Sequence, residues 1–427
     1  MNIIDELEWR GAINQQTDEA GLRELISEKE IGVYCGIDPT GDSMHIGHLI
    51  PFMVLKRFQL AGHKPVILVG GATGSIGDPS GKSEERVLQS AEQVEENIQK
   101  LTAQVQKLFD AGKDEKSIRL VNNLEWTGEL TLLDFLRNVG KSFNVNTMLS
   151  KDIVASRLET GISFTEFTYQ ILQSIDFLHL YRNEDVQLQV GGADQWGNIT
   201  AGLEFIRKQE SAEAKAFGLT IPLLLKADGT KFGKTAGGAI WLDAEKTTPY
   251  EFYQFWLNQD DRDVVRYLKY FTFLSQDEIN ELAEQVETEP HKRAAQKTLA
   301  REMTLFVHGE EALADAEKIT AALFSGEVKD LTAKQIEEGF KNMPTFEAPK
   351  EERNIVEWLV DVVGIEPSRR QAREDIKNGA ISINGEKETD VEAIIKPENS
   401  FEERFILVRK GKKKYFLVKL VESGTER

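Results

Sequence analysis

Two histidines, His45 and His48, have a spacing that suggests chemistry. They stand in the segment DPTGDSMHIGH, residues 38–48, and the apolar stretch LIPFMVLKRF follows them. A separation of three residues puts both side chains on one face at the start of a helix. A helix N-terminus offers free N–H groups and a partial positive charge to phosphates, and Gly47 leaves room for a nucleotide. The arrangement suits ATP, whereas a polar helix cap or a metal-binding pair is the alternative for such histidines.

A glycine-rich segment, KADGTKFGKTAGG at residues 226–238, carries Lys231, Lys234 and Thr235. When a carboxylate attacks the α-phosphate of ATP, negative charge grows on the phosphorus centre and on the departing pyrophosphate. Cations on a flexible loop can follow that charge. The alternative is a solvated turn with two surface lysines.

A second glycine-rich segment, GGATGSIGDPSGKS at residues 70–83, has the composition of a phosphate-binding P-loop. That motif requires glycine where this chain has Ile76, so the spacing excludes it.

The stretch SFTEFTYQILQSIDFLHLYRN, residues 163–183, is expected to form a helix with polar residues on an apolar face. Tyr169, Gln173 and Asp176 recur at i, i+4 and i+7, and therefore project from one side. Buried polar groups are costly unless they are paired. They therefore indicate a bound ligand, with an internal hydrogen-bond network as the alternative.

The segment GGADQWGN, residues 191–198, follows the apolar run VQLQV. Gly192 permits close approach of a nucleotide, Asp194 can accept from ribose hydroxyls, and Gln195 faces the carboxylate of a substrate. The alternative is a structural turn in which Asp194 caps a helix.

The chain resembles the class I aminoacyl-tRNA synthetases, because HIGH at residues 45–48 and KFGKT at residues 231–235 occur in the order of their two signatures. Phe232, Gly233 and Thr235 depart from the usual KMSKS, and Gly233 gives up a hydroxyl donor. The segment GGATGSIGDPSG resembles its counterpart in tyrosyl and tryptophanyl synthetases. Most of the chain is similar to bacterial-type tyrosyl-tRNA synthetases.

This resemblance implies a role for each matching residue. Asp78, Tyr169 and Gln173 would bind the amino group of tyrosine, and Asp176 with Tyr34 would bind its phenolic hydroxyl. Thr40 and the two histidines would stabilise the phosphates and the transition state, while Lys82, Arg86 and the KFGKT residues would hold pyrophosphate. The implied ATP contacts are Cys35, Gly36, Asp38, Gly47, Gly192, Asp194 and Lys234. Cys35 could equally be an inert buried thiol.

The implied reaction converts L-tyrosine and ATP into tyrosyl-adenylate and pyrophosphate, and then transfers tyrosine to the 3′ end of tRNA(Tyr). Mg²⁺ is expected on the pyrophosphate. The family is homodimeric, and the apolar stretch LTLLDFLRNVG, residues 130–140, is a candidate for the interface, although it could equally be core. A tryptophanyl synthetase, an adenylyltransferase for a small metabolite and an inactive RNA-binding protein are the rival interpretations.

The elements that must position these residues form an α/β fold. Short apolar runs near residues 31–38, 64–74 and 186–194 alternate with amphipathic stretches such as residues 90–110. This pattern predicts a Rossmann-like, doubly wound parallel sheet, which binds ligands beyond the carboxyl ends of its strands. We expect this catalytic domain at 1–247, a helical anticodon-binding domain at 248–325, a linker at 326–352 and a small α+β domain at 353–427.

The last predicted domain resembles the RNA-binding fold named after ribosomal protein S-four. From residue 351 onward, 15 Lys and Arg face 16 Asp and Glu, a net of −1 against −19 for the whole chain. Two basic clusters there are expected to contact tRNA phosphates, although basic runs are often solvated faces. Their residues are Arg369, Arg370, Arg373, Lys377, Lys410, Lys412, Lys413 and Lys414.

Composition limits the remaining possibilities. The net charge of −19 argues against a protein that coats nucleic acid with its whole surface, and no DNA partner is expected. The single cysteine excludes an internal disulfide and argues against a zinc site. No apolar run reaches membrane-spanning length and the acidic N-terminus does not fit a signal peptide, so we expect a cytoplasmic protein that does not bind membranes.

Overall fold

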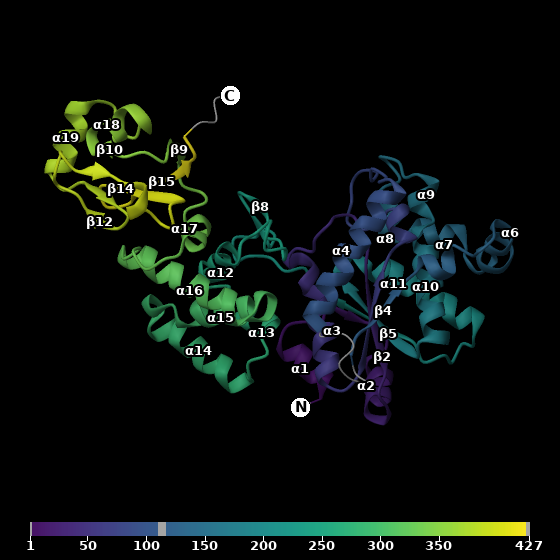
Figure 1. Ribbon diagram of the computed structural model, residues 1–427. Coiled ribbons are helices and arrows are strands. Elements are labelled where there is room, and N and C mark those ends of the chain that lie inside the picture. Colours follow the sequence, from purple (N-terminus) through teal and green to yellow (C-terminus); the bar gives the residue numbers. More distant parts are fainter. Residues whose placement is uncertain (1, 110–116, 424–427) are drawn as a thin grey trace. The chain divides into compact units, whose positions relative to one another are not determined.

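The computed structural model describes residues 2–109 and 117–423, and it divides into two compact units (Figure 1). Unit 1 comprises Met1–Lys246 and Gln259–Leu299, and unit 2 comprises Thr247–Asn258 and Ala300–Arg427. All the residues predicted to bind tyrosine or ATP belong to unit 1.

A six-stranded sheet forms the centre of unit 1, in the order β1-β6-β5-β2-β3-β4. Five strands run parallel and β1 is antiparallel to β6, which confirms the predicted α/β fold. The chain order reverses between β5 and β2, and this is the switch point where doubly wound sheets bind ligands. The strand bounds are β1 Gln15–Gln16, β2 Gly32–Ile37, β3 Lys64–Val69, β4 Arg119–Asn122, β5 Val186–Gly192 and β6 Phe217–Ile221.

Helices cover both faces of this sheet. Figure 1 shows α3 (Ile46–Leu60) and α4 (Ala91–Phe109) on one side, and α10 (Tyr169–Asn183) and α11 (Trp196–Gln209) on the other. Strands that are covered on both sides need continuous apolar sequence, and β3 and β5 are buried along almost their whole length. The other α-helices of unit 1 are α1 Ile3–Trp9, α2 Glu19–Glu28, α5 Leu124–Thr127, α6 Leu132–Asp134, α7 Val145–Ser150, α8 Asp152–Ala155, α9 Phe164–Phe167, α13 Val264–Phe271 and α14 Gln276–Thr288.

Shorter elements complete unit 1. A π-helical turn at Phe135–Val139 follows α6, and 3₁₀ turns lie at Thr73–Ser75, Gly140–Ser142, Ala193–Gln195 and Pro290–Lys292. The KFGKT segment forms a small hairpin of β7 (Lys234–Thr235) and β8 (Gly238–Ala239). None of the helices in the described ranges is long and apolar enough to cross a membrane.

The region predicted as a helical domain, 248–325, is helical but contributes to both units. Its helices α13 and α14 belong to unit 1, whereas α12 (Pro249–Leu257) and α16 (Glu310–Ser325) belong to unit 2. Helix α15 (Ala294–His308) crosses the boundary. The start of α14 carries a capping box, in which Ser275 and Glu278 each accept from the backbone of the other.

Unit 2 also contains a five-stranded sheet in the order β12-β11-β14-β15-β9. The segment 326–352, predicted as a linker, has regular structure there: α17 (Ala333–Gly339) and β9 (Thr345–Pro349), which pairs in parallel with β15. Polarity and two prolines suggested a linker, but β9 gains its backbone hydrogen bonds from a strand about 70 residues later. The remaining elements are β10 Arg353–Asn354, α18 Ile355–Glu357, a π-helical turn Trp358–Val362, α19 Arg369–Lys377, β11 Ile381–Ile383, β12 Glu386–Lys387, β13 Ile394–Ile395, a 3₁₀ turn Pro397–Asn399, β14 Phe405–Lys410 and β15 Lys414–Val421.

Candidate active site

Most residues predicted to bind tyrosine or ATP gather at the carboxyl ends of three adjacent strands, β5, β2 and β3. Tyr34, Cys35 and Gly36 lie on β2, with Asp38 and Thr40 just beyond it. Asp78 follows β3, Gly192 ends β5 with Asp194 and Gln195 after it, and α10 supplies its polar face. These side chains therefore lie together at the edge of the sheet where doubly wound folds bind ligands.

Tyr34 and Asp176 form a buried polar pair. Asp176 accepts hydrogen bonds from Asn123 Nδ2 at 3.0 Å and from Trp126 Nε1 at 2.9 Å. The Tyr34 hydroxyl is buried and has no hydrogen-bond partner among the described residues, and its ring packs edge-on against Phe177. Burial raises the pKa of Asp176 to about 7 and raises the pKa of Tyr34 well above its usual value. A partner is thus missing on the Tyr34 side of this pair.

A second carboxylate, Asp38, is connected to Asp176 by hydrogen bonds. Tyr169 donates its hydroxyl to Asp38 Oδ2 at 2.6 Å, and Thr73 donates to Oδ1 at 2.7 Å. Asn123 Nδ2 reaches both Thr73 Oγ1 and Asp176, each at 3.0 Å. Burial raises the pKa of Asp38 to about 6. Tyr169 thus lies between Asp38 and the next group of polar residues.

That group surrounds Asp78. Gln195 Nε2 donates to Asp78 Oδ2 at 2.9 Å, and Gln173 Nε2 donates to Gln195 Oε1 at 3.2 Å. Gln173 also donates to Gln189 Oε1 at 2.9 Å. Gln189 lies beside Tyr34 in the register of β5 and β2, and its Nε2 is buried without a partner in the described part of the chain. The three helix residues Tyr169, Gln173 and Asp176 therefore do share one face, as predicted.

The two histidines cap helix α3. His45 is the N-cap residue, and its Nδ1 accepts from the Gly47 N–H at 3.0 Å, while His48 Nδ1 accepts from the His45 N–H at 3.1 Å. Because both Nδ1 atoms accept, the proton of each neutral ring is on Nε2. Burial lowers the pKa of His48 to about 3, and burial with the charge of Lys234 lowers the pKa of His45. Both imidazoles are therefore neutral donors at pH 7.

The expectation that α3 offers free N–H groups to phosphates is wrong. The N–H groups of His45 and Gly47 are bound to the imidazoles, that of Ile46 donates to Ile240 O at 3.0 Å, and that of His48 donates to His45 O. The hydrogen-bond donors that the two histidine side chains can still offer are their Nε2–H groups. A Cβ on Gly47 would lie 2.7 Å from the His45 ring, so glycine is needed here for the histidine and not only for a nucleotide.

The KFGKT hairpin presents its two lysines to solvent. Thr235 Oγ1 donates to Gly238 O at 3.2 Å and accepts from the Gly237 N–H, so this hydroxyl shapes the hairpin turn. Gly233 has φ +88°, and a Cβ there would lie 3.0 Å from Ile46. The departure from serine is thus explained by a left-handed backbone close to α3. Phe232 is buried against Tyr267 and Phe271.

The remaining predicted residues lie around this hairpin and the 82–86 segment. Burial raises the pKa of Asp194, and the nearby charges of Lys82 and Lys231 partly offset that rise. Arg86 Nε donates to Asp78 O at 2.6 Å.

Gly36 and Thr40 are exposed at the end of β2. Cys35 is buried, and burial raises the pKa of its thiol to about 12, so this thiol is not a nucleophile.

Unit 2 carries the residues predicted to bind RNA. Arg370, Arg373 and Lys377 are exposed on α19, and Arg369 pairs with Asp361 at 2.5 Å. Lys412, Lys413 and Lys414 are exposed in and after the turn between β14 and β15. Lys410 differs from them, because it pairs with the buried Glu366 at 3.2 Å and also approaches Asp375 at 3.7 Å. Its side chain is therefore held inside unit 2.

Several residues that support the site were not predicted from the sequence. Thr73, Asn123, Trp126 and Asn198 hold Asp38, Asp176 and Asp78 in place, and none was assigned a role. Gln189 carried a signal, because a glutamine inside the apolar run VQLQV is costly unless it is paired. Asn123 follows β4 as the other site residues follow their strands, but a single asparagine after a strand is common.

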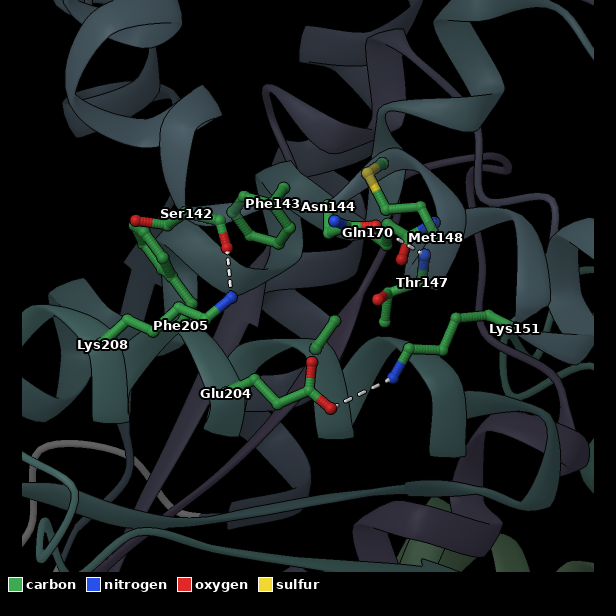
Figure 2. A pocket seen from close by; sticks show the side chains of 11 residues that line it. Ser142, Phe143, Asn144, Thr147, Met148, Lys151, Gln170, Glu204, Phe205 and Lys208 are labelled. Carbon is green, nitrogen blue, oxygen red and sulfur yellow. Dashed lines mark hydrogen bonds and ion pairs between the residues drawn. The ribbon is translucent and has the colours of Figure 1, made fainter.

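A separate cavity of about 50 Å³ lies between the 142–151 segment and helices α10 and α11 (Figure 2). Lys208 Nζ donates to Ser142 O at 2.7 Å, and Lys151 Nζ lies 3.6 Å from Glu204 Oε1. Both polar side-chain atoms of the buried Gln170 lack partners among the residues that the structure describes. This volume suits one or two ordered water molecules. Within residues 2–109 and 117–423, no group of three or more His, Cys, Asp or Glu is arranged to hold a metal ion.

Known families match nearly the whole chain. Residues 27–325 match the family described as tRNA synthetases class I (W and Y). Residues 335–418 match the tyrosine–tRNA ligase SYY-like C-terminal domain. The two matches together cover five of the six strands of the unit 1 sheet, β2 to β6, and most of unit 2.

Individual relatives point the same way. A tyrosine–tRNA ligase 2 of Bacillus cereus is 72% identical over 420 residues, which cover 98% of this chain and 100% of the relative. The tyrosine–tRNA ligase of Pediococcus pentosaceus is 71% identical with the same coverage. The crystal structure of a C-terminally truncated mitochondrial tyrosyl-tRNA synthetase from Aspergillus nidulans is 34% identical, with a TM-score of 0.69 over 75% of this chain and 94% of that one. The chain therefore belongs to the class I aminoacyl-tRNA synthetases, in their tyrosine–tRNA ligase family.

Proposed function

We propose that this protein activates L-tyrosine with ATP and transfers it to tRNA(Tyr) in the cytoplasm. The observation that carries the choice of amino acid is the buried Tyr34 hydroxyl, without a partner in the described ranges, beside the buried Asp176 carboxylate. A phenolic hydroxyl can donate to Asp176 and accept from Tyr34 at the same time. A phenylalanine side chain would leave the Tyr34 hydroxyl without a partner, and an indole N–H could donate to Asp176 but could not accept from Tyr34. A buried polar group without a partner is costly.

The other end of tyrosine fits the group around Asp78. Gln173 and Asp78 are linked through Gln195, and Tyr169 donates to Asp38. Together Asp78, Tyr169 and Gln173 offer a carboxylate, a hydroxyl and an amide oxygen, and an ammonium group needs three acceptors. Gln195 Nε2 and Oε1 are both within this set, where a substrate carboxylate would lie. These contacts therefore orient tyrosine with its carboxylate toward the histidines and lysines.

The chemical step then requires stabilisation of growing negative charge. The tyrosine carboxylate attacks the α-phosphate, and the bond to pyrophosphate breaks. His45 and His48 donate from Nε2–H without adding charge, while Lys82, Arg86, Lys231 and Lys234 supply cations for pyrophosphate. By analogy with an oxyanion donor, each group contributes about 3 kcal/mol to lowering the barrier. Mg²⁺ enters as the counterion of the phosphates of ATP.

The proposed nucleotide contacts are Cys35, Gly36, Asp38, Thr40, Gly47, Gly192 and Asp194. Asp194 follows β5 at the switch point of the sheet, where it can accept from ribose hydroxyls. The exposed basic residues of unit 2 are proposed to contact tRNA phosphates. Lys410 is not among them, because it forms an ion pair with Glu366 within unit 2.

We also propose a homodimer whose interface includes the 130–140 stretch. Leu132, Leu133 and Leu136 are 72%, 76% and 55% exposed, so these three side chains lie outside the core, whereas Val139 of the same stretch is buried in it. Phe164 is another large exposed side chain of unit 1, at 77%. Clustered exposed apolar side chains are typical of a protein interface.

The test is tyrosine-dependent exchange of labelled pyrophosphate into ATP. We expect exchange with tyrosine, and none above background with phenylalanine or tryptophan. Exchange with tryptophan alone would establish a tryptophanyl enzyme, and exchange without any amino acid would indicate an adenylyltransferase for another substrate. Aminoacylation of tRNA(Tyr) by the same preparation would then test the second step.

A further inference from the structure

The backbone of the 82–86 segment is held in place by contacts with other parts of the chain. The segment contains no helix or strand, and Lys82 and Glu85 are exposed. The proposed function nevertheless needs Lys82 and Arg86 at fixed places, since a cation displaced by about 1 Å loses much of its effect on a reacting phosphate. Some other part of the protein must hold this segment in register.

A buried ion pair lies next to it. Arg157 Nη1 and Glu166 Oε2 are 3.0 Å apart, and their side chains are only 2% and 1% exposed. Removing two charges from water is expensive, and apolar residues of similar size often stabilise a protein more. Stability alone is therefore a poor explanation for this pair.

The pair contacts the 82–86 segment at two adjacent residues. Glu166 Oε1, the oxygen that does not bind Arg157, accepts the backbone N–H of Arg86 at 2.8 Å. Arg157 Nη2 donates to Glu85 Oε2 at 3.2 Å, and the Ser163 hydroxyl donates to Glu85 Oε1. The segment is thus held through one backbone group and one side chain.

This attachment also fixes the Arg86 side chain. With its backbone N–H bound to Glu166, Arg86 turns its Nε to the carbonyl oxygen of Asp78 at 2.6 Å. Asp78 belongs to the proposed ammonium site, so the pyrophosphate cation and the amino-acid site are in direct contact. Glu166 has both oxygens engaged, one by Arg157 and one by Arg86.

We propose that the Arg157–Glu166 ion pair positions Arg86 for the pyrophosphate of ATP without touching substrate. The inference rests on the proposed role of Arg86 in that function. Glu166 and Arg157 are positioning residues: Arg157 orients the Glu166 carboxylate, and this carboxylate orients Arg86.

The experiment compares wild type, Glu166→Gln and a matched control in pyrophosphate exchange, with rates normalised by active-site titration. A glutamine has one acceptor oxygen, so either Arg86 or Arg157 loses its partner. We expect kcat to fall about tenfold and the KM for pyrophosphate to rise, with the KM for tyrosine within about twofold of wild type. The control is Glu184→Gln, which breaks an exposed pair with Arg119 and should leave all three constants unchanged.

Two further variants separate positioning from folding. In an Arg86→Ala background, adding Glu166→Gln should lower kcat by less than about twofold further, because Glu166 acts through Arg86, which is absent there. Arg157→Lys keeps the positive charge, but a lysine cannot reach the carboxylates of Glu166 and Glu85 at once. Its kcat should lie between those of wild type and Glu166→Gln.

Several results would overturn the inference. One such result is a wild-type kcat and a wild-type KM for pyrophosphate in Glu166→Gln. Another is a fall in kcat that disappears after normalisation to active sites. A third is a tenfold further fall in kcat when Glu166→Gln is added to Arg86→Ala. If wild type lacked tyrosine-dependent exchange, the proposed function would fail first. If wild type were active and Arg86→Ala had no effect, only the role of Arg86 and this inference would fall.

Discussion

At the scale of single residues, the site is a set of polar groups that are ordered before any substrate arrives. Asn123 connects the carboxylates of Asp38 and Asp176 through Thr73, and Trp126 completes the hydrogen bonds of Asp176. The Tyr34 hydroxyl is left without a partner among the described residues. Such pre-ordering lowers the conformational cost of binding. The unpaired Tyr34 hydroxyl favours a phenol, because a phenolic hydroxyl can form the missing hydrogen bond.

Tyr34→Phe tests this preference. Removal of a buried hydroxyl that lacks a partner should stabilise the ligand-free protein by about 1 kcal/mol. Tyrosine should bind about tenfold more weakly, and selectivity over phenylalanine should fall by a similar factor. Urea unfolding and exchange kinetics measure the two effects. Tyr181→Phe is the control, because Tyr181 lies on the same helix as Asp176 but is not proposed to bind tyrosine. It should leave tyrosine binding and the selectivity over phenylalanine unchanged.

The raised pKa of Asp176 predicts how stability depends on pH. Burial lifts this pKa to about 7, above its value in an unfolded chain, so between about pH 4 and 7 the folded protein retains a proton that the unfolded chain has released. Stability is therefore greater below about pH 4 and falls as pH rises toward 7. The loss attributable to this carboxyl is at most about 4 kcal/mol.

Denaturant unfolding of the ligand-free protein from about pH 4 to about pH 8 measures this decline. Asp176→Asn cannot titrate, so its decline should be smaller by the contribution of Asp176, and the remainder should come from Asp38 and other groups. Equal declines in wild type and variant would contradict a raised pKa at Asp176.

At the scale of elements, the KFGKT hairpin is fixed at both ends. On one side Phe232 packs on α13. On the other, the Leu242 N–H donates to Met44 O at 2.9 Å and the Ile46 N–H to Ile240 O, so the strand after the hairpin pairs with the histidine motif. The histidine motif therefore shares backbone hydrogen bonds with residues 240–242, just after the hairpin, and the exposed Lys234 is close enough to His45 to lower its pKa.

Phe232→Ala should release one end of the hairpin. The cavity should cost about 3 kcal/mol or more of stability, and kcat for exchange should fall with little change in the KM for tyrosine, because the lysines act on the phosphates. Phe232→Met is the matched control, since it restores the usual residue of the motif and fills much of the same volume. Similar kcat values for the alanine and methionine variants would count against an anchoring role.

At the scale of the whole molecule, the two units divide the proposed work. Unit 1 contains every residue proposed to act on tyrosine and ATP, and unit 2 contains the basic residues of the C-terminal domain. Activation and transfer should therefore respond separately to mutation.

Replacement of Lys412, Lys413 and Lys414 by Glu tests this separation. These lysines are exposed, so the fold should tolerate the change, whereas aminoacylation should weaken and its dependence on salt should decrease. Pyrophosphate exchange should be unaffected. Loss of exchange in this variant would show that the division between the units is incorrect.

Leu133→Asp tests the proposed homodimer. A charge at the centre of an apolar interface should shift the protein toward the monomer, which light scattering after size-exclusion chromatography measures. Leu60→Asp is the control, because Leu60 is also exposed, at 64%, but lies outside the 130–140 stretch. A dimer that resists the Leu133 change, or a wild-type monomer, would reject this interface.

The sequence by itself determined the parallel sheet, the residues at the ends of its strands and the family. These follow from local features: apolar runs for β2, β3 and β5, the spacing of Tyr169 and Asp176 on one helix face, and the motif around His45. The extent of the linker was less predictable, because β9 is stabilised by pairing with β15, far along the chain.

Only the tertiary structure decided which groups support these residues. Asn123 and Trp126 meet Asp176 from 53 and 50 residues away along the chain, and Glu166 reaches the Arg86 backbone across 80 residues. It also decided that the N–H groups at the start of α3 are occupied, since Ile46 finds its acceptor at Ile240. Local sequence patterns carry no record of such partners, because a hydrogen bond depends on distance and direction in space, which the folded chain alone sets.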